Sequence, residues 1–205
     1  DVVIDCTGVF KDRESLSKHI HGSVKKVILC VPTSDESIEH VVMGVNDKNF
    51  DFEKADIISN ASCTTNCAAV MTHVLDTTFG IESGFLTTVH SYTSTQSLVD
   101  NKDDKFTRGR AAALSIIPTT TGASDAVCRV TALEQPQLGA GAIRVPTPVG
   151  SITDMVCLLK RDTTIDEVNE SFKKLSEGEL KDILGYSDIP LVSSDFIANP
   201  LSFIF

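Results

Sequence analysis

A cysteine stands at the point where a short polar segment passes into a helical pattern. Residues 59–67 have the sequence SNASCTTNC, with Cys63 at the centre. Backbone N–H groups and the helix dipole at a helix start lower the pKa of a thiol and favour the nucleophilic thiolate. Ser62 and Thr64 beside it can cap the helix or offer hydroxyl groups to an anion. The segment predicts a reactive cysteine, with a purely structural cysteine as the alternative.

A histidine follows at the end of the next strand-like run. His90 stands near the end of the run Phe85–Ser91, and an imidazole beside a thiol stabilises the thiolate and exchanges protons with the reacting oxygen. One alternative is a histidine that only satisfies local hydrogen bonds. Another is a zinc site built from Cys63, Cys67 and a histidine, but three intervening residues and no second ligand pair disfavour it. No metal is therefore predicted.

The elements that must position these residues indicate an α/β fold. An apolar run at 1–7, a helical pattern at 12–21 and a β-branched run at 26–31 have the order of a parallel strand–helix–strand unit. No Gly-x-Gly-x-x-Gly segment accompanies it, so any phosphate-binding first turn is expected upstream of Asp1. Further strands are predicted at Val41–Val45, Ile57–Ile58, Phe85–Ser91, Gly141–Val145 and Ser151–Leu159, and further helices at Cys67–Thr78 and Thr164–Leu175.

Composition narrows the classes of protein. The 205 residues include 18 basic and 28 acidic ones, giving a net charge of −10, which argues against binding of a nucleic-acid backbone. No apolar run approaches 18 residues, so no membrane span is predicted. Six scattered cysteines do not form the framework of a disulfide scaffold and favour a reducing cytoplasm. Because the chain starts with Asp1 and without a leader, we expect it to be cut from a longer protein.

Several motifs, taken together and in order, resemble those of phosphorylating glyceraldehyde-3-phosphate dehydrogenase. They are DCTGVF at 5–10, ASCTTNC at 61–67, TTVHSYTSTQ at 87–96, RGRAAALSIIPTTTGA at 108–123 and RVPTP at 144–148. The resemblance implies the second half of a Rossmann-type dinucleotide-binding domain at 1–61. It also implies an α+β catalytic domain with a mixed or antiparallel sheet at 62–205, shortened at its carboxyl end.

The resemblance also implies roles for particular residues. Cys63 matches the nucleophile that attacks an aldehyde, and His90 matches the general base. Thr93 and Arg144 match the substrate-phosphate site. The inorganic-phosphate site is matched by Ser62, Thr64, Thr121 and Gly122. Arg108 matches a further phosphate contact. Thr7, Gly8 and Cys30 match the strand ends beside the cofactor.

The implied activity is oxidation and phosphorylation of glyceraldehyde 3-phosphate to 1,3-bisphosphoglycerate in glycolysis, through a cysteine thioester and with hydride transfer to NAD, or alternatively NADP. A cytoplasmic homotetramer is implied, in which the polar stretch Tyr92–Arg110 reaches a neighbouring subunit and its cofactor. Erythrose-4-phosphate dehydrogenase is a second possibility, although Thr93 within HSYTSTQ favours the triose enzyme. A truncated, non-catalytic relic that serves as an interaction module is a third.

Two departures from the family pattern are expected to matter. Val149 replaces an asparagine next to the substrate-phosphate arginine, which could loosen that site. Residues Ile197–Phe205 are expected to depart from the family, and the apolar tail Leu201–Phe205 to be an artefact rather than a designed terminus.

Overall fold

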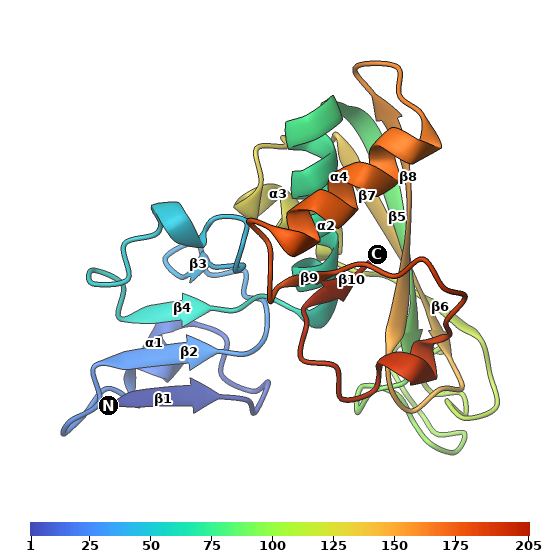
Figure 1. Ribbon diagram of the computed structural model, residues 1–205. Coiled ribbons are helices and arrows are strands. Elements are labelled where there is room, and N and C mark those ends of the chain that lie inside the picture. The colour runs from blue at the N-terminus through green and yellow to red at the C-terminus, as the bar shows by residue number, and fades with distance from the viewer.

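The computed structural model describes residues 1–205 and contains a parallel sheet built from the first part of the chain (Figure 1). Its strand order is β1-β2-β4-β3, and every pair is parallel. Helix α1 begins after Asp12, whose carboxylate accepts a hydrogen bond from Ser15 N–H and so caps the first turn. The elements are β1 (Val2–Asp5), α1 (Arg13–Ser17), β2 (Lys26–Leu29), β3 (Glu39–His40), the 3-10 turn η1 (Asp47–Asn49) and β4 (Ile57–Ser59).

A second, mixed sheet follows, with the order β6-β7-β5-β8. Strands β5 and β7 run parallel, whereas β8 and β6 lie antiparallel to β5 and β7 respectively. The two sheets confirm an α/β fold that combines a parallel and a mixed sheet. The strands are β5 (Ile81–Ser91), β6 (Ile117–Thr119), β7 (Leu138–Val145) and β8 (Ser151–Leu159).

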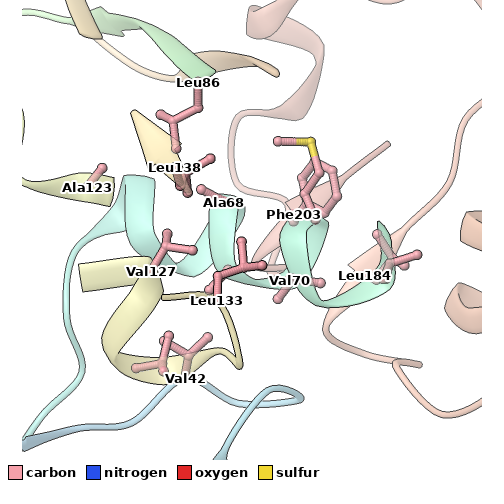
Figure 2. Packing of buried hydrophobic residues seen from close by; sticks show 14 of the residues in the cluster. Val42, Ala68, Val70, Leu86, Ala123, Val127, Leu133, Leu138, Leu184 and Phe203 are labelled. Atoms are coloured by element: carbon pink, nitrogen blue, oxygen red, sulfur yellow. The ribbon is translucent and has the colours of Figure 1, made fainter. Parts of the chain in front are cut away.

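Three helices lie on one face of the mixed sheet, and the main hydrophobic core lies between these helices and the sheet. They are α2 (Cys63–Phe79), α3 (Ala123–Val130) and α4 (Ile165–Glu177). Figure 2 shows Ala68 and Val70 of α2 within the same cluster as Val127 of α3 and Leu86 of β5. This core anchors α2, and with it the position of Cys63. None of the helices has the length and apolar character that crossing a membrane requires.

The opposite face of the mixed sheet is not covered. Because side chains alternate along a strand, the residues between the core positions point away from the helices. Phe85 of β5 and Ile152, Val156 and Leu158 of β8 are between 52% and 69% exposed. An exposed apolar face of this kind is typical of an interaction surface.

The predicted strand Val41–Val45 is wrong. The strand is confined to Glu39–His40, and residues 43–46 form a turn. Asn46 holds this turn, since its side-chain oxygen accepts from Val42 N–H and its amide donates to the His40 carbonyl. Gly44 has a φ of +79°, a conformation that excludes an extended strand. Val41 and Val42 are therefore buried just before a turn, whereas Met43 within the turn is exposed.

Helix α2 begins at Cys63, four residues before the predicted start at Cys67. Threonine and asparagine hide the helical pattern in the first turn, because both are weak helix formers. The predicted helix Thr164–Leu175 corresponds to α4, and the reciprocal hydrogen bonds of Thr164 and Glu167 form a capping box there. Strand β6 and helix α3 were not predicted.

The carboxyl-terminal tail is an ordered part of the core, contrary to expectation. Strand β10 (Phe203–Ile204) pairs in parallel with β9 (Leu184–Gly185), after the 3-10 turn η2 (Ser193–Phe196). The Phe205 ring stacks on the fully buried Phe172 ring of α4, with 3.9 Å between centroids. The apolar residues of the tail thus complete the packing around α4.

Candidate active site

Cys63 is the first residue of α2, and the preceding backbone is held in a special conformation. Ser62 is the N-cap, and its hydroxyl oxygen accepts from Thr65 N–H at 3.1 Å. Ala61 has a φ of +54° although it is buried and not glycine, a strained conformation that clusters at functional sites. The Ser59 hydroxyl accepts from Ala61 N–H and supports this turn. Cys63 itself remains exposed.

The structure brings Cys63 and His90 together, from α2 and from β5. The Cys63 Sγ and His90 Nε2 atoms are 3.2 Å apart. The hydrogen bond with His90 is the main cause that lowers the pKa of the Cys63 thiol, and the Thr64 N–H adds to it. The same contact raises the pKa of His90 against the opposing effect of burial. Each partner therefore favours the charged form of the other, a thiolate beside an imidazolium.

Arg144 of β7 lies on the far side of the imidazole. Its Nη1 atom is 2.8 Å from His90 Nδ1 and donates to the Ser91 carbonyl at 2.8 Å. Because a guanidinium only donates, this contact requires an unprotonated Nδ1 and leaves the ring proton of a neutral His90 on Nε2, facing the thiol. A protonated Nδ1 would instead donate to the Ser91 carbonyl oxygen, which is also 2.8 Å away. Arg144 could then no longer donate to Nδ1 and would be displaced.

Cys67 and Cys157 are half-buried, and neither has a histidine as a partner. Burial raises the pKa of Cys67 and of Cys157 to about 11 each. These thiols stay protonated at neutral pH, so the environment singles out Cys63 among them.

Arg144 also lines a small recess next to the pair. Its other lining residues are Thr95, Gln96, Arg108, Ile117 and Thr119. Burial, together with the charge of Arg108, lowers the pKa of Arg144, and no carboxylate lines the recess. The Gln96 Nε2 group is buried there without a hydrogen-bond partner. Two guanidinium groups and a free amide donor are suited to an anion.

Sequence reasoning placed Arg108 and Arg144 in the site but missed Thr95, Gln96 and Thr119. Thr95 and Gln96 belong to the motif TTVHSYTSTQ, so their position in that motif was the available signal. Thr119 ends β6, a strand that carried no clear sequence signal.

The remaining predicted phosphate residues lie at helix starts and in the loop after β5. Thr93 N–H donates to the Gln96 side chain, and the Thr93 and Thr95 hydroxyl oxygens are 3.0 Å apart. Thr121 accepts from Ala123 N–H, and Gly122 is the N-cap of α3 without a side-chain cap. On α2, Ser62 is the N-cap and Thr64 is the second residue of the helix.

The predicted cofactor residues lie at the carboxyl edge of the parallel sheet. Thr7 and Gly8 follow β1, and Cys30 follows β2. Gly8 has a φ of +68°, and a Cβ there would approach nothing closer than 4.0 Å, so the turn leaves open space. Cys63 is close to the same edge in the chain. Asn60, three residues before Cys63, donates its N–H to the carbonyl of Leu29 at the end of β2.

A cavity of about 580 Å³ borders Cys63 on another side and is lined mainly by apolar residues. Its walls come from Val149–Thr153 and from the segment between Leu191 and Ile204. Val149, the residue expected to loosen the site, forms part of this wall. The volume lies in the usual range for small-molecule sites.

The fold and this geometry define a class: an α/β protein in which a helix-start thiol is paired with a histidine. Residues 62–205 match the family described as glyceraldehyde 3-phosphate dehydrogenase, C-terminal domain. The chain belongs to the glyceraldehyde-3-phosphate dehydrogenase family.

Individual relatives are similar to this chain over all or nearly all of its length. Glyceraldehyde-3-phosphate dehydrogenase 2 of Streptomyces avermitilis is 47% identical over 205 residues, covering 100% of this chain and 61% of the relative. Glyceraldehyde-3-phosphate dehydrogenase 1 of Bacillus cereus is 48% identical over 196 residues, covering 96% and 58%. The chain therefore spans about 60% of the length of these relatives. Since the family match extends to Phe205, the expectation that residues 197–205 depart from the family is wrong.

Proposed function

We propose that the protein oxidises and phosphorylates glyceraldehyde 3-phosphate to 1,3-bisphosphoglycerate through a thioester on Cys63, as part of glycolysis. The observation that carries this proposal is the 3.2 Å contact between Cys63 Sγ and His90 Nε2, next to a recess with two arginines. A paired thiolate is a nucleophile for an aldehyde, and the two arginines that line the recess could bind the phosphate group of the same substrate.

In the proposed mechanism, the Cys63 thiolate attacks the aldehyde carbon, and the resulting oxyanion takes the proton from His90 Nε2. His90 then accepts the hydroxyl proton back as hydride leaves the same carbon, which produces the thioester. An oxygen of inorganic phosphate attacks the thioester carbonyl, the carbon–sulfur bond breaks, and the acyl phosphate leaves. The imidazolium stabilises the thiolate that is released.

Arg144 connects substrate binding with the protonation of His90. The guanidinium that contacts Nδ1 is the group proposed to bind the substrate phosphate, together with Arg108 and Thr93. When phosphate draws Arg144 away, Nδ1 is free to hold a proton and donate it to the Ser91 carbonyl. Substrate binding thereby favours the imidazolium that the first step requires.

Inorganic phosphate is proposed to bind near the starts of α2 and α3. Unpaired backbone N–H groups at helix starts attract anions, and the residues proposed for this site are Ser62, Thr64, Thr121 and Gly122.

The proposed cofactor is NAD, or alternatively NADP, which accepts the hydride when it is bound. The open turn at Gly8 fits a group lying against the backbone. Thr7, Gly8 and Cys30 would hold this group at the carboxyl edge of the parallel sheet, where ligands of open α/β sheets bind.

We propose a boundary between two domains at residues 61 and 62, with the nucleotide-binding part before it and the catalytic part after it. The strands of the parallel sheet all precede this point. A cytoplasmic homotetramer is proposed from the family. The exposed side chains of Leu98, Val99 and Phe106 in the polar stretch Tyr92–Arg110 support a contact with a neighbouring subunit.

The test is an assay of the protein with glyceraldehyde 3-phosphate, NAD and inorganic phosphate, following the absorbance of the reduced cofactor. We expect turnover that requires phosphate and is lost in Cys63→Ser. Erythrose 4-phosphate serves as the competing substrate, and faster turnover of it would contradict the triose assignment. Selective alkylation of Cys63 without any turnover would contradict the proposed enzymatic activity and favour the alternative of a truncated, non-catalytic protein.

A further inference from the structure

Two cysteines lie side by side at the carboxyl edge of the parallel sheet, away from Cys63. The register of β1 with β2 ends at Asp5 opposite Leu29, so Cys6 and Cys30 are the next residues on the two strands. The ladder continues to this point, because Cys30 N–H donates to the Asp5 carbonyl at 3.0 Å. Neighbouring residues of parallel strands project their side chains to the same face of the sheet. The fold therefore places both thiols next to each other on the same face of the sheet.

The distances suit a covalent bond between them. The two Sγ atoms are 3.4 Å apart, and both cysteines are exposed to small solutes. Neighbouring strands are spaced about 4.8 Å apart, which lies within the range of Cα separations, roughly 4.4–6.8 Å, that a disulfide spans. A rotation of the side chains is enough to bring the sulfur atoms together.

We propose that Cys6 and Cys30 form a redox-active dithiol that a peroxide closes to a disulfide and a dithiol reductant reopens. Cys6 sulfur attacks the peroxide, an S–O bond forms as the O–O bond breaks, and water leaves with the thiol proton. Cys30 sulfur then attacks the sulfenic sulfur, the S–S bond forms as the S–O bond breaks, and a second water carries away the Cys30 proton. Two thiols are oxidised and one hydrogen peroxide is reduced to two waters.

Burial and the neighbouring Cys6 raise the pKa of Cys30, so the Cys30 thiol is mostly protonated at neutral pH and its attack on the sulfenic sulfur should become faster as the pH rises. The disulfide would lie at the edge proposed to contact the cofactor. That consequence rests on the proposed function, whereas formation of the cross-link does not.

Peptide mapping tests the cross-link directly. The protein is treated with hydrogen peroxide, its free thiols are alkylated, and it is digested with trypsin. Cys6 then lies in the peptide 1–11 and Cys30 in the peptide 27–48. Cys63 and Cys67 share a third peptide, 55–102. We expect a linked pair of the first two peptides, lighter by two hydrogens than their sum, and loss of alkylation at both cysteines. Dithiothreitol should restore alkylation.

The control variants separate this pair from the other thiols. Cys6→Ser should abolish the linked peptide, and Cys157→Ser, which removes a cysteine from β8, should leave it unchanged. Cys63→Ser should also leave it unchanged, because the cross-link does not pass through the reactive thiol. Full alkylation of Cys6 and Cys30 after peroxide has oxidised Cys63 would overturn the proposal, as would their separate oxidation to sulfinic acids.

Discussion

The proposed reactivity of Cys63 depends on its hydrogen bond with His90, and the effect of removing that bond has a predictable sign. In His90→Asn the main cause that lowers the pKa of the thiol is lost, so less thiolate exists at neutral pH. The alkylation rate with iodoacetamide should fall near pH 7, and its pH profile should shift to higher pH. In the wild type, alkylation should decline only as the pH falls through the lowered pKa of Cys63.

The matched control for this variant is His73→Asn, on the same helix but ten residues from Cys63. Its pH profile should match that of the wild type. Identical profiles for His90→Asn and the wild type would remove His90 from the activation of the thiol. Turnover in His90→Asn should fall by roughly 10²–10⁴-fold, which is typical for loss of a general base.

Arg144 provides a second prediction at this scale, one that separates substrate binding from chemistry. A charge-assisted hydrogen bond contributes about 1.5–3 kcal/mol, or roughly 10–150-fold in affinity. Arg144→Leu should therefore lower kcat/KM for glyceraldehyde 3-phosphate by that factor and affect unphosphorylated glyceraldehyde much less. An equal loss for both aldehydes, together with a lower Tm, would assign Arg144 a structural role. Arg161→Leu, two residues after the end of β8 that is remote from the site, is the control.

At the scale of elements, the start of α2 is the feature on which the site depends. Ser62 accepts from Thr65 N–H, and replacing such a cap with alanine costs about 1 kcal/mol of the free energy of unfolding. We expect this loss in Ser62→Ala, measured by urea denaturation. Ser62→Gly should lose only a few tenths of that energy, because glycine is tolerated at an N-cap. Equal stability of Ser62→Ala and the wild type would contradict the capping role.

At the scale of the whole molecule, the uncovered face of the mixed sheet predicts self-association. Val156 lies on this face and is 69% exposed. A charge buried in an interface without a partner is costly, so Val156→Lys should produce a smaller species than the wild type in analytical ultracentrifugation. Ile165→Lys changes an apolar residue of α4 that is 80% exposed and should not alter the assembly. A monomeric wild type would contradict this prediction.

The sequence by itself determined the first strand–helix–strand unit of the parallel sheet, residues 85–91 of the strand that carries His90 and the position of Cys63 next to a helix start. These features depend on local patterns and on contiguous motifs such as ASCTTNC. The sequence did not determine the turn at 43–46, because Asn46 and Gly44 override the strand preference of the valines through hydrogen bonds and a positive φ.

Only the tertiary structure decided which distant groups meet. Arg144 contacts His90 because β7 pairs in register with β5, placing the two residues opposite each other. Gln96 enters the same recess from the following loop, and Cys6 faces Cys30 across two strands. Strand pairing joins residues 24 to 54 positions apart in these contacts. Side-chain periodicity carries no information about such pairing, since it specifies which face a residue occupies and not which strand lies beside it.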